Sequence, residues 1–171
     1  SLTSIETQLK VQQLQQEILM MMPEEVGNEP LDKEKYLVKN AKKIGVLAAG
    51  LAAQRYGAKL NDEQEVLVSI ANIANQLYAM ESAVIRTAKA IAKDGVDKAM
   101  QKLLYTQIFA QEAFAQIEQE AKTVLLHATD GEQARMMLSA LRKLTRNEPY
   151  DLIAKKREAS VKIINAEKYV V

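Results

Sequence analysis

Apolar side chains recur at helical spacing along almost the whole chain, and no stretch alternates convincingly between apolar and polar positions as a strand does. The pattern is interrupted at Pro23, Gly57, Gly95, Gly131 and Pro149, and proline and glycine commonly end helices. It therefore predicts six helices, four of them long, over residues 4–22, 31–56, 62–93, 96–128, 132–145 and 151–168. The short connections favour an all-α, up-and-down helical bundle.

Two of the predicted helices carry signals about their surroundings. Helix 96–128 has one apolar face that includes Phe114 and a second that includes Leu104, so we expect it to be the central helix. Before helix 62–93, residues Asn61–Gln64 have the pattern of a capping box, which predicts a side-chain cap at its start.

Helix 31–56 contains the longest apolar run, Ile44–Ala53, which is too short to span a bilayer and is predicted to lie in the core. Gly45 and Gly50 keep part of this helix thin. A neighbouring helix is therefore expected to approach it closely there.

The composition limits the classes of function. A chain of 171 residues is long enough for one domain with a sizeable core, so residues 1–171 are predicted to form a single domain. The 23 Lys and Arg are interspersed with 22 Asp and Glu, which argues against nucleic acid as a partner. Because there is no cysteine, disulfides, thiolate metal sites and thiol nucleophiles are excluded, which fits a reducing compartment.

Glu81 is the residue that the apolar pattern explains least well. Counting by sevens from Leu67, Glu81 lies in a column of the apolar stripe of helix 62–93, so we expect its side chain to point inward. A buried carboxylate needs a cation and hydrogen-bond donors, or it takes up a proton. Glu81 is therefore predicted either to fix the register of the bundle through a structural ion pair or to belong to a site.

The predicted partner of Glu81 is Arg146. If consecutive long helices run antiparallel between the predicted breaks, Arg146 is the nearest arginine to the level of Glu81 in the C-terminal third of the chain. Arg157 is the second choice, and Arg55 lies roughly 25 Å away by the same rise per residue. We therefore predict a structural, buried ion pair between Glu81 and Arg146.

The chain contains no self-contained catalytic, cofactor-binding or metal-binding constellation. His127 is the only histidine, so a ferritin-like di-iron centre, which needs two Glu-x-x-His pairs, is excluded. No phosphate-binding loop, dinucleotide-binding fingerprint or nucleophile elbow occurs. His127 is interpreted as a structural residue near a helix C-terminus, where a cation interacts favourably with the helix dipole, and a phospho-acceptor role is the alternative.

Met20, Met21 and Met22 form a cluster at the predicted end of the first helix, directly before Pro23. Methionine side chains are flexible and polarizable, so such clusters suit adaptable interfaces and also fill cores. The later helices can close a core without the first one. We therefore predict that these methionines belong to an interface, and capping of the bundle's own core is the alternative.

Six short segments look like parts of one known family, in order and in spacing. They are GLAAQRYG (50–57), EQEVL (63–67), YAMESAVIR (78–86), QEAF (111–114), LSALRKLTR (138–146) and AEKY (166–169). Together they make nearly the whole chain resemble the extra C-terminal helical domain of bacterial acyl-CoA dehydrogenases of the very-long-chain type. The ending AEKYVV (166–171) is similar to the natural end of such proteins.

The resemblance implies a larger flavoprotein. In this family a catalytic core with FAD removes two hydrogens across the Cα–Cβ bond of a fatty acyl-CoA thioester, and a glutamate acts as the base. No residue here matches that base or a FAD or CoA contact, so Glu81 is not assigned to catalysis. The resemblance also implies docking on the catalytic domain of the same chain, a homodimer, a cytoplasmic location and, from mitochondrial relatives, association with a membrane surface.

Two functions are compatible with the sequence. The first is a C-terminal accessory domain, excised from an FAD-dependent acyl-CoA dehydrogenase, that supports assembly or docking rather than chemistry. Ser1 in place of an initiator methionine agrees with an excised piece. The alternative is a free-standing helical-bundle interaction module that binds a partner helix or a lipid surface.

Overall fold

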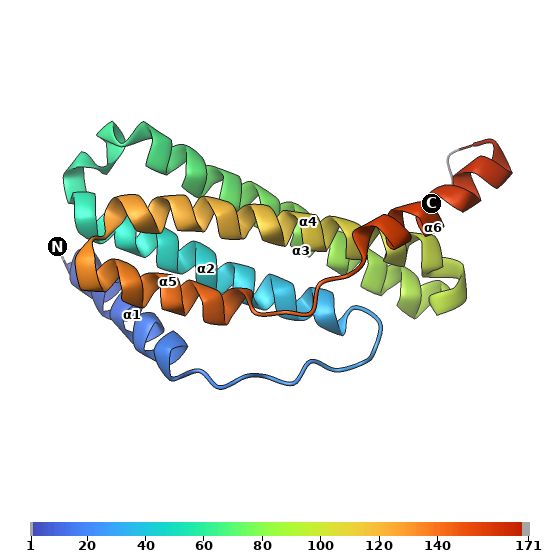
Figure 1. Cartoon of the computed structure of the whole chain (residues 1–171), viewed down its shortest axis with the longest axis horizontal. Coiled ribbons are helices and arrows are strands. Elements are labelled where there is room, and N and C mark those ends of the chain that lie inside the picture. Colours follow the sequence, from blue (N-terminus) through green and yellow to red (C-terminus); the bar gives the residue numbers. More distant parts are fainter. Residues whose placement is uncertain (1, 169–171) are drawn as a thin grey trace.

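The computed structural model describes residues 2–168, except for the side chains of residues 2–4 and 7. Within this range it contains six α-helices, one 3₁₀-helix and no strand, which confirms the predicted all-α fold. The helices are α1 (Leu2–Met20), α2 (Asp32–Tyr56), η1 (Gly57–Asp62), α3 (Gln64–Asp94), α4 (Val96–Ala128), α5 (Gly131–Thr145) and α6 (Leu152–Ala166). Helices α2 to α5 run alternately up and down, as Figure 1 shows.

Glycines end two of the long helices at the predicted places. Gly57 follows α2 with a φ of 52°, and Gly95 follows α3 with a φ of 84°, a region of backbone conformation that glycine adopts without strain. Two boundaries differ from the prediction. α1 ends at Met20, short of the predicted end, and the capping box at Asn61–Gln64 does not form, because η1 precedes α3 and Glu63 takes the N-cap position without a side-chain hydrogen bond.

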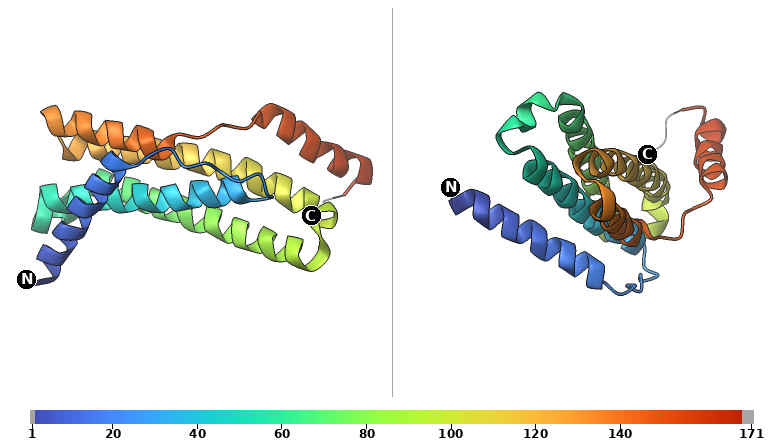
Figure 2. Two further views of the ribbon diagram at one scale, coloured as in Figure 1. Left: turned by 90° about the horizontal axis from the view of Figure 1, so that it is seen from below. Right: turned by 60° about the vertical axis from the view of Figure 1, so that its left-hand side comes forward.

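α4 is the central helix, as its two apolar faces predicted. It packs against α2, α3, α5 and α6, whereas α3 and α5 do not touch each other in the described part of the chain. Phe114 of α4 lies in one core cluster with Ile44 of α2, Met80 of α3 and Leu144 of α5. The views in Figure 2 show these four helices side by side and α1 and α6 at the outside.

Polar side chains mark the register between α3 and α4. Gln76 Nε2 donates to Gln116 Oε1 at 2.6 Å, and nearer the turn the hydroxyls of Thr87 and Thr106 lie 2.7 Å apart. The residue number rises along α3 as it falls along α4, which is the signature of an antiparallel pair. The two threonines are buried, so their hydrogen bond satisfies groups that water does not reach.

α1 approaches α2 closely where the sequence predicted a thin helix. Val11 and Ile18 of α1 are buried, and a Cβ atom added to Gly50 would lie only 2.4 Å from Val11 Cγ2. The absence of a side chain at Gly50 therefore allows the two helices to meet. At Gly45 the nearest atom to such a Cβ is Cγ2 of Ile73 in α3, at 3.4 Å.

α6 is joined to the bundle over a small area. Of its residues, only Ala159 is buried, and among the helices described it packs against α4 alone. It starts at Asp151, whose carboxylate accepts a hydrogen bond from the Ala154 amide at 3.0 Å as a side-chain cap. It then continues past the end of the bundle at which α3 turns into α4 (Figures 1 and 2).

Candidate functional site

Glu34, in the first turn of α2, is the charged side chain that the fold buries most completely. It is 1% exposed, and among the described residues no other Asp, Glu, Lys or Arg belongs to the buried class. The hydroxyl of Tyr150, in the linker between α5 and α6, donates to Glu34 Oε1 at 2.7 Å. Glu34 Oε2 has no hydrogen-bond partner, although such buried groups usually have one.

Two lysines flank the ring of Tyr150. Lys33 Nζ lies 3.5 Å from the ring centroid, and Lys155 Nζ lies 4.4 Å from it. These distances are typical of cation–π contacts. Lys33 also donates to the carbonyl oxygen of Glu148, and Lys155 donates to Gln107 Oε1 at 2.6 Å, so both ammonium groups are engaged with the linker or with α4.

The surroundings of Tyr150 change its acidity. Burial raises the pKa of the Tyr150 hydroxyl, and the hydrogen bond to Glu34 and the charge of that carboxylate raise it further. The phenol therefore remains a hydrogen-bond donor at neutral pH. Burial acts in the opposite direction on Lys33, whose pKa it lowers, because removal from water disfavours the charged form of either group.

Two further polar side chains of the bundle bind the backbones of α5 and α6, the helices that the linker joins. Asn40 Nδ2 donates to the Leu144 carbonyl at 3.0 Å, and Gln101 Nε2 donates to the Ala159 carbonyl at 2.9 Å. Asn40 and Gln101 are themselves buried, and burying an amide is favourable only when it is hydrogen-bonded. The position of α6 thus depends on directed hydrogen bonds more than on apolar burial.

A groove runs beside the linker, and we call it the linker groove. It lies between the loop after α1, the start of α2 and the α5–α6 linker, with a volume of about 940 Å³. Met21 and Met22 line it together with Lys143 and Arg146. The fold thus brings two of the predicted interface methionines close to the predicted ion-pair arginine. The sequence alone gave no sign that these residues lie together.

The three methionines differ in exposure. Met20 and Met22 are 83% and 78% exposed, whereas Met21 packs against the core. Capping of the bundle's core therefore applies to Met21, and the side chains of Met20 and Met22 are free for other contacts.

The predicted ion pair between Glu81 and Arg146 is wrong. Glu81 Oε1 lies 2.5 Å from Lys42 Nζ of α2, and the two side chains are 37% and 51% exposed, so the pair is neither buried nor made with arginine. The physical reason is the arrangement of the helices: Arg146 follows α5, and α3 does not touch α5. Arg146 instead accepts a hydrogen bond at its backbone carbonyl from Tyr36, at 3.3 Å.

Glu81 was placed inward because the apolar stripe of α3 was centred on the wrong column. The buried positions of α3 include two polar residues, Ser69 and Thr87, together with Val66, Ile73, Met80 and Val84. Ser69 and Thr87 lie on the side of the buried face away from Glu81, so an apolar stripe drawn without them is centred closer to Glu81. Glu81 lies on the opposite flank of that face, where it reaches solvent and Lys42.

The sequence contained a usable signal for Glu34 that was not read. Glu34 lies three residues before Leu37 and ten before Ile44, which is the spacing of one helical face, and both of these residues are fully buried. Helical periodicity, which suggested that Glu81 points inward, therefore indicates the burial of Glu34 more strongly. Tyr150 had no such signal, because it lies outside any helix.

His127 occupies a structural setting. Its ring stacks on that of Tyr56 with centroids 5.9 Å apart, and its Nε2 lies 3.4 Å from Glu63 Oε2. The Tyr56 hydroxyl donates to the His127 carbonyl at 3.0 Å. Within residues 2–168 no cluster of three or more His, Cys, Asp or Glu side chains has a geometry that could hold a metal ion.

The hydrogen bonds around the linker position α6. Glu34 is hydrogen-bonded to the Tyr150 hydroxyl, and Lys33 and Lys155 flank the ring of Tyr150. None of the helices described has an apolar stretch long enough to cross a membrane. The candidate functional site is therefore α6 together with the linker that fixes it.

Comparison with known proteins shows which family and which proteins this chain is similar to. Residues 40–143 match the family described as "Acyl-CoA dehydrogenase, C-terminal domain". A protein of Bacillus subtilis (strain 168) named "Probable acyl-CoA dehydrogenase" is 59% identical over 162 residues, which make up 95% of this chain and 27% of that protein.

A solved structure agrees with the sequence match. The crystal structure of an acyl-CoA dehydrogenase complexed with FAD from Bacillus anthracis is similar with a TM-score of 0.92 and 58% identity. The similarity covers 96% of this chain and 28% of that one. This chain thus spans little more than a quarter of the length of either relative.

Proposed function

This chain belongs to the acyl-CoA dehydrogenase C-terminal domain family, and on that premise we propose that it is the helical C-terminal domain of an FAD-dependent acyl-CoA dehydrogenase. The observation that carries the proposal is the similarity, at 58% identity and a TM-score of 0.92, to a protein that binds FAD. We extend it to the very-long-chain type, on the motifs that the sequence shares with that group.

The proposed parent enzyme removes two hydrogens from the Cα–Cβ bond of an acyl-CoA thioester and transfers a hydride to FAD. No residue of the sequence matches the family's base or a flavin contact, and the one carboxylate buried among the described residues, Glu34, accepts a hydrogen bond from Tyr150. The catalytic residues are therefore assigned to the remainder of the parent, and this domain is assigned to assembly and docking.

The exposed methionines fit such a role. Met20 and Met22 are exposed, and Met22 lines the linker groove together with the cations Lys143 and Arg146. We propose that they contribute to an interface of the assembled enzyme, either with the catalytic domain or within a homodimer. A cytoplasmic protein with peripheral contact to a membrane is the corresponding proposal for location.

The test is to express the complete reading frame that encodes this chain. We expect a yellow protein with about one flavin per polypeptide that reduces an electron acceptor when a fatty acyl-CoA is added. A reading frame that encodes only the helical bundle, or a colourless full-length protein without this activity, would contradict the proposal and favour a free-standing interaction module.

The role in assembly needs a second measurement. In the full-length protein, replacing Met20 and Met22 by Glu should reduce self-association or weaken flavin retention, while the bundle itself remains folded. A matched change at an exposed polar position of α1, Gln16→Glu, serves as the control. Unchanged assembly in the methionine variant would remove these residues from the interface.

A further inference from the structure

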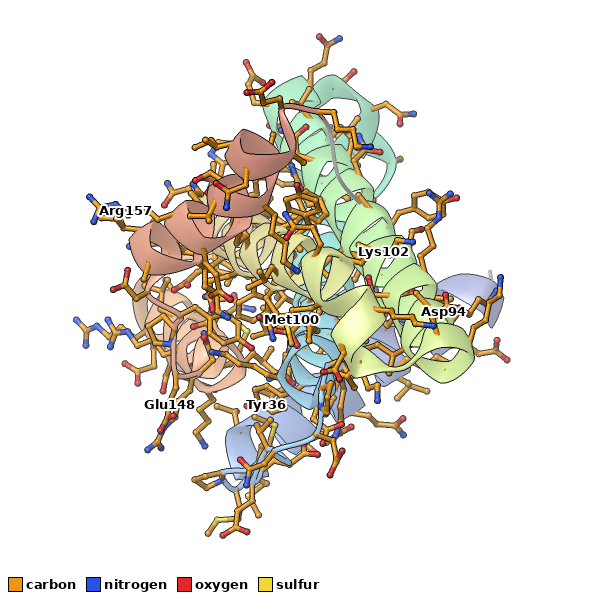
Figure 3. All side chains as sticks on the ribbon, turned by 90° about the vertical axis from the view of Figure 1, so that its right-hand side faces the viewer. Tyr36, Asp94, Met100, Lys102, Glu148 and Arg157 are labelled. Atoms are coloured by element: carbon orange, nitrogen blue, oxygen red, sulfur yellow. The ribbon has the colours of Figure 1, made fainter. Side chains whose placement is uncertain are left out.

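The side of α6 that faces away from α4 carries apolar side chains. Ile153, Val161 and Ile164 are 66%, 51% and 68% exposed. At 100° per residue these three cluster on the side of the helix opposite Ala159, the residue buried against the bundle. Arg157 lies among them, and Figure 3 shows its side chain pointing away from the bundle. We call these four residues the outer face of α6.

A helix with apolar residues on two opposite sides is typical of a position between two bodies. The inner side of α6, with Ala159, meets α4, but no described element covers the outer face. Single exposed apolar residues are common on protein surfaces. Three on one helical face instead form an apolar patch, and burial of such a patch against a partner is favourable.

The attachment of α6 supports the same interpretation. The buried carboxylate of Glu34 binds Tyr150 in its linker, and the buried amide of Gln101 binds its backbone at Ala159. These hydrogen bonds determine where the helix lies, while the helix contributes only one buried residue to the core of this domain. A helix that is held by directed hydrogen bonds but buries only one residue in its own domain is well suited to bind a partner outside this chain.

We propose that the outer face of α6 docks against the remainder of the same polypeptide, the part of the parent enzyme that this chain lacks. This inference rests on the proposed function. This chain matches only 27% and 28% of the lengths of its two relatives, so most of the parent is absent here. The partner surface should be apolar, with a carboxylate opposite Arg157, for which no ion-pair partner is recorded among the described residues.

A tethered partner fits the size of the face better than a second copy does. Three apolar side chains and one arginine cover much less than the ~800 Å² per partner of a typical stable complex between separate proteins. A segment of the same chain is present at an effective concentration of about millimolar, so a small contact is sufficient to hold it. The proposed contact is therefore intramolecular.

Photo-crosslinking in the full-length protein tests the proposal. A benzoylphenylalanine side chain replaces Ile164, and a control protein carries it at Val46, an exposed valine of α2. After irradiation, we expect the Ile164 position to form crosslinks to peptides outside residues 1–171, in several-fold excess over the control. These products should run at the mass of one chain.

Three results would overturn the proposal. A product at twice the chain mass would show that the partner is a second copy, adducts with added phospholipid vesicles would show that it is a lipid surface, and no excess over the Val46 position would show that the face is free. The Ile164→Glu variant gives a second measurement: it should lower the melting temperature of the full-length protein by several degrees, and Val46→Glu should not. Equal melting temperatures would also contradict docking.

The failure of this inference can be distinguished from failure of the proposed function. A full-length protein without flavin contradicts the proposed function, whatever the crosslinks show. A yellow, active protein in which Ile164 forms no excess crosslinks contradicts only the docking of α6.

Discussion

Two glutamates of this chain have similar sequence surroundings and opposite physical environments. Glu34 is buried and hydrogen-bonded to the hydroxyl of Tyr150, whereas Glu81 is partly exposed and paired with Lys42. An exposed ion pair stabilises little, because water already solvates both charges well. A buried acceptor matters more, because its removal leaves its donor without a partner.

This contrast leads to a prediction about Glu34→Ala and Glu81→Ala. The first substitution removes the buried acceptor of the Tyr150 hydroxyl, which is itself partly buried, and should lower the free energy of unfolding by about 1–3 kcal/mol. The second removes a half-exposed pair and should change it by about 0–1 kcal/mol. Chemical denaturation followed by circular dichroism measures both. An effect of Glu81→Ala as large as that of Glu34→Ala would place Glu81 in the interior after all.

The raised pKa of Tyr150 predicts a dependence of stability on pH. Since the folded-state pKa lies above the unfolded value, the unfolded chain releases this proton first as the pH rises. The stability that Tyr150 contributes is thus fully present below pH ~10 and is lost as the pH rises from there toward the folded-state pKa. The free energy of unfolding should fall more steeply above pH ~10 in the wild type than in Tyr150→Phe.

The titration of Tyr56 does not affect the comparison of the wild type with Tyr150→Phe. Its pKa is also raised, mainly by burial, but it is present in both proteins, so its contribution cancels in the difference. Parallel curves for the wild type and Tyr150→Phe would show that the Tyr150 phenol titrates as in the unfolded chain.

At the scale of elements, the contact between α1 and α2 depends on one missing side chain. A Cβ at Gly50 would overlap Val11, whose short branched side chain has little freedom to move aside. The close approach of α1 is therefore a property of the pair Gly50 and Val11, not of α1 alone.

We predict opposite outcomes for Gly50→Ala and Gly45→Ala. The first should force α1 outward and destabilise the domain by about 1–3 kcal/mol, as other overpacked contacts do. The second meets only an ordinary contact with Ile73 and gains helix propensity, so it should be neutral or stabilising by up to about 1 kcal/mol. Thermal denaturation of the two variants decides the matter. Equal changes in stability would mean that α1 does not pack closely against Gly50.

The α5–α6 linker is the other element whose position depends on particular residues. A buried carboxylate binds the linker at Tyr150, and buried amides bind the helices on either side of it, so its geometry is set by hydrogen bonds with defined directions. This differs from the α3–α4 pair, where a long apolar stripe supplies most of the contact.

At the scale of the whole molecule, α2 to α5 form the bundle, and α1 and α6 lie against its outside (Figure 2). Ile18 of α1 is fully buried and belongs to the core, so α1 is part of the domain. The exposed end of α1 with Met20 and Met22, and the outer face of α6, are separate surfaces. The domain thus has two places at which the rest of an enzyme could make contact.

The difference between core and surface on α1 can be measured. Ile18→Ala should destabilise the domain by about 2–5 kcal/mol, because it leaves a cavity in the core. Replacing Met20 and Met22 by Glu should change the free energy of unfolding by less than about 0.5 kcal/mol, since both side chains are exposed. Unfolding in guanidinium chloride compares them. A large loss in the methionine variant would show that these residues stabilise the isolated domain.

The sequence by itself determined the helices and much of their packing. Hydrophobic periodicity and the placement of Gly57, Gly95 and Pro149 predicted all six α-helices, because both signals act within a few residues. The two apolar faces of α4 predicted its central position, and the small residues of α2 predicted the close approach of a neighbouring helix, which at Gly50 is α1. Each of these properties follows from the sequence of a single helix and does not depend on which neighbour that helix contacts.

The tertiary structure alone decided which charges are buried and which residues they meet. Periodicity locates a helical face only approximately. Because Ser69 and Thr87, on the side of the buried α3 face away from Glu81, are polar, the expected apolar stripe lay closer to Glu81. The partner of Glu81 depended on the neighbour of α3, which is α2 and not α5, so Lys42 took the place of Arg146. The pairing of Glu34 with Tyr150 joins residues far apart in sequence, and only the complete fold brings such residues together.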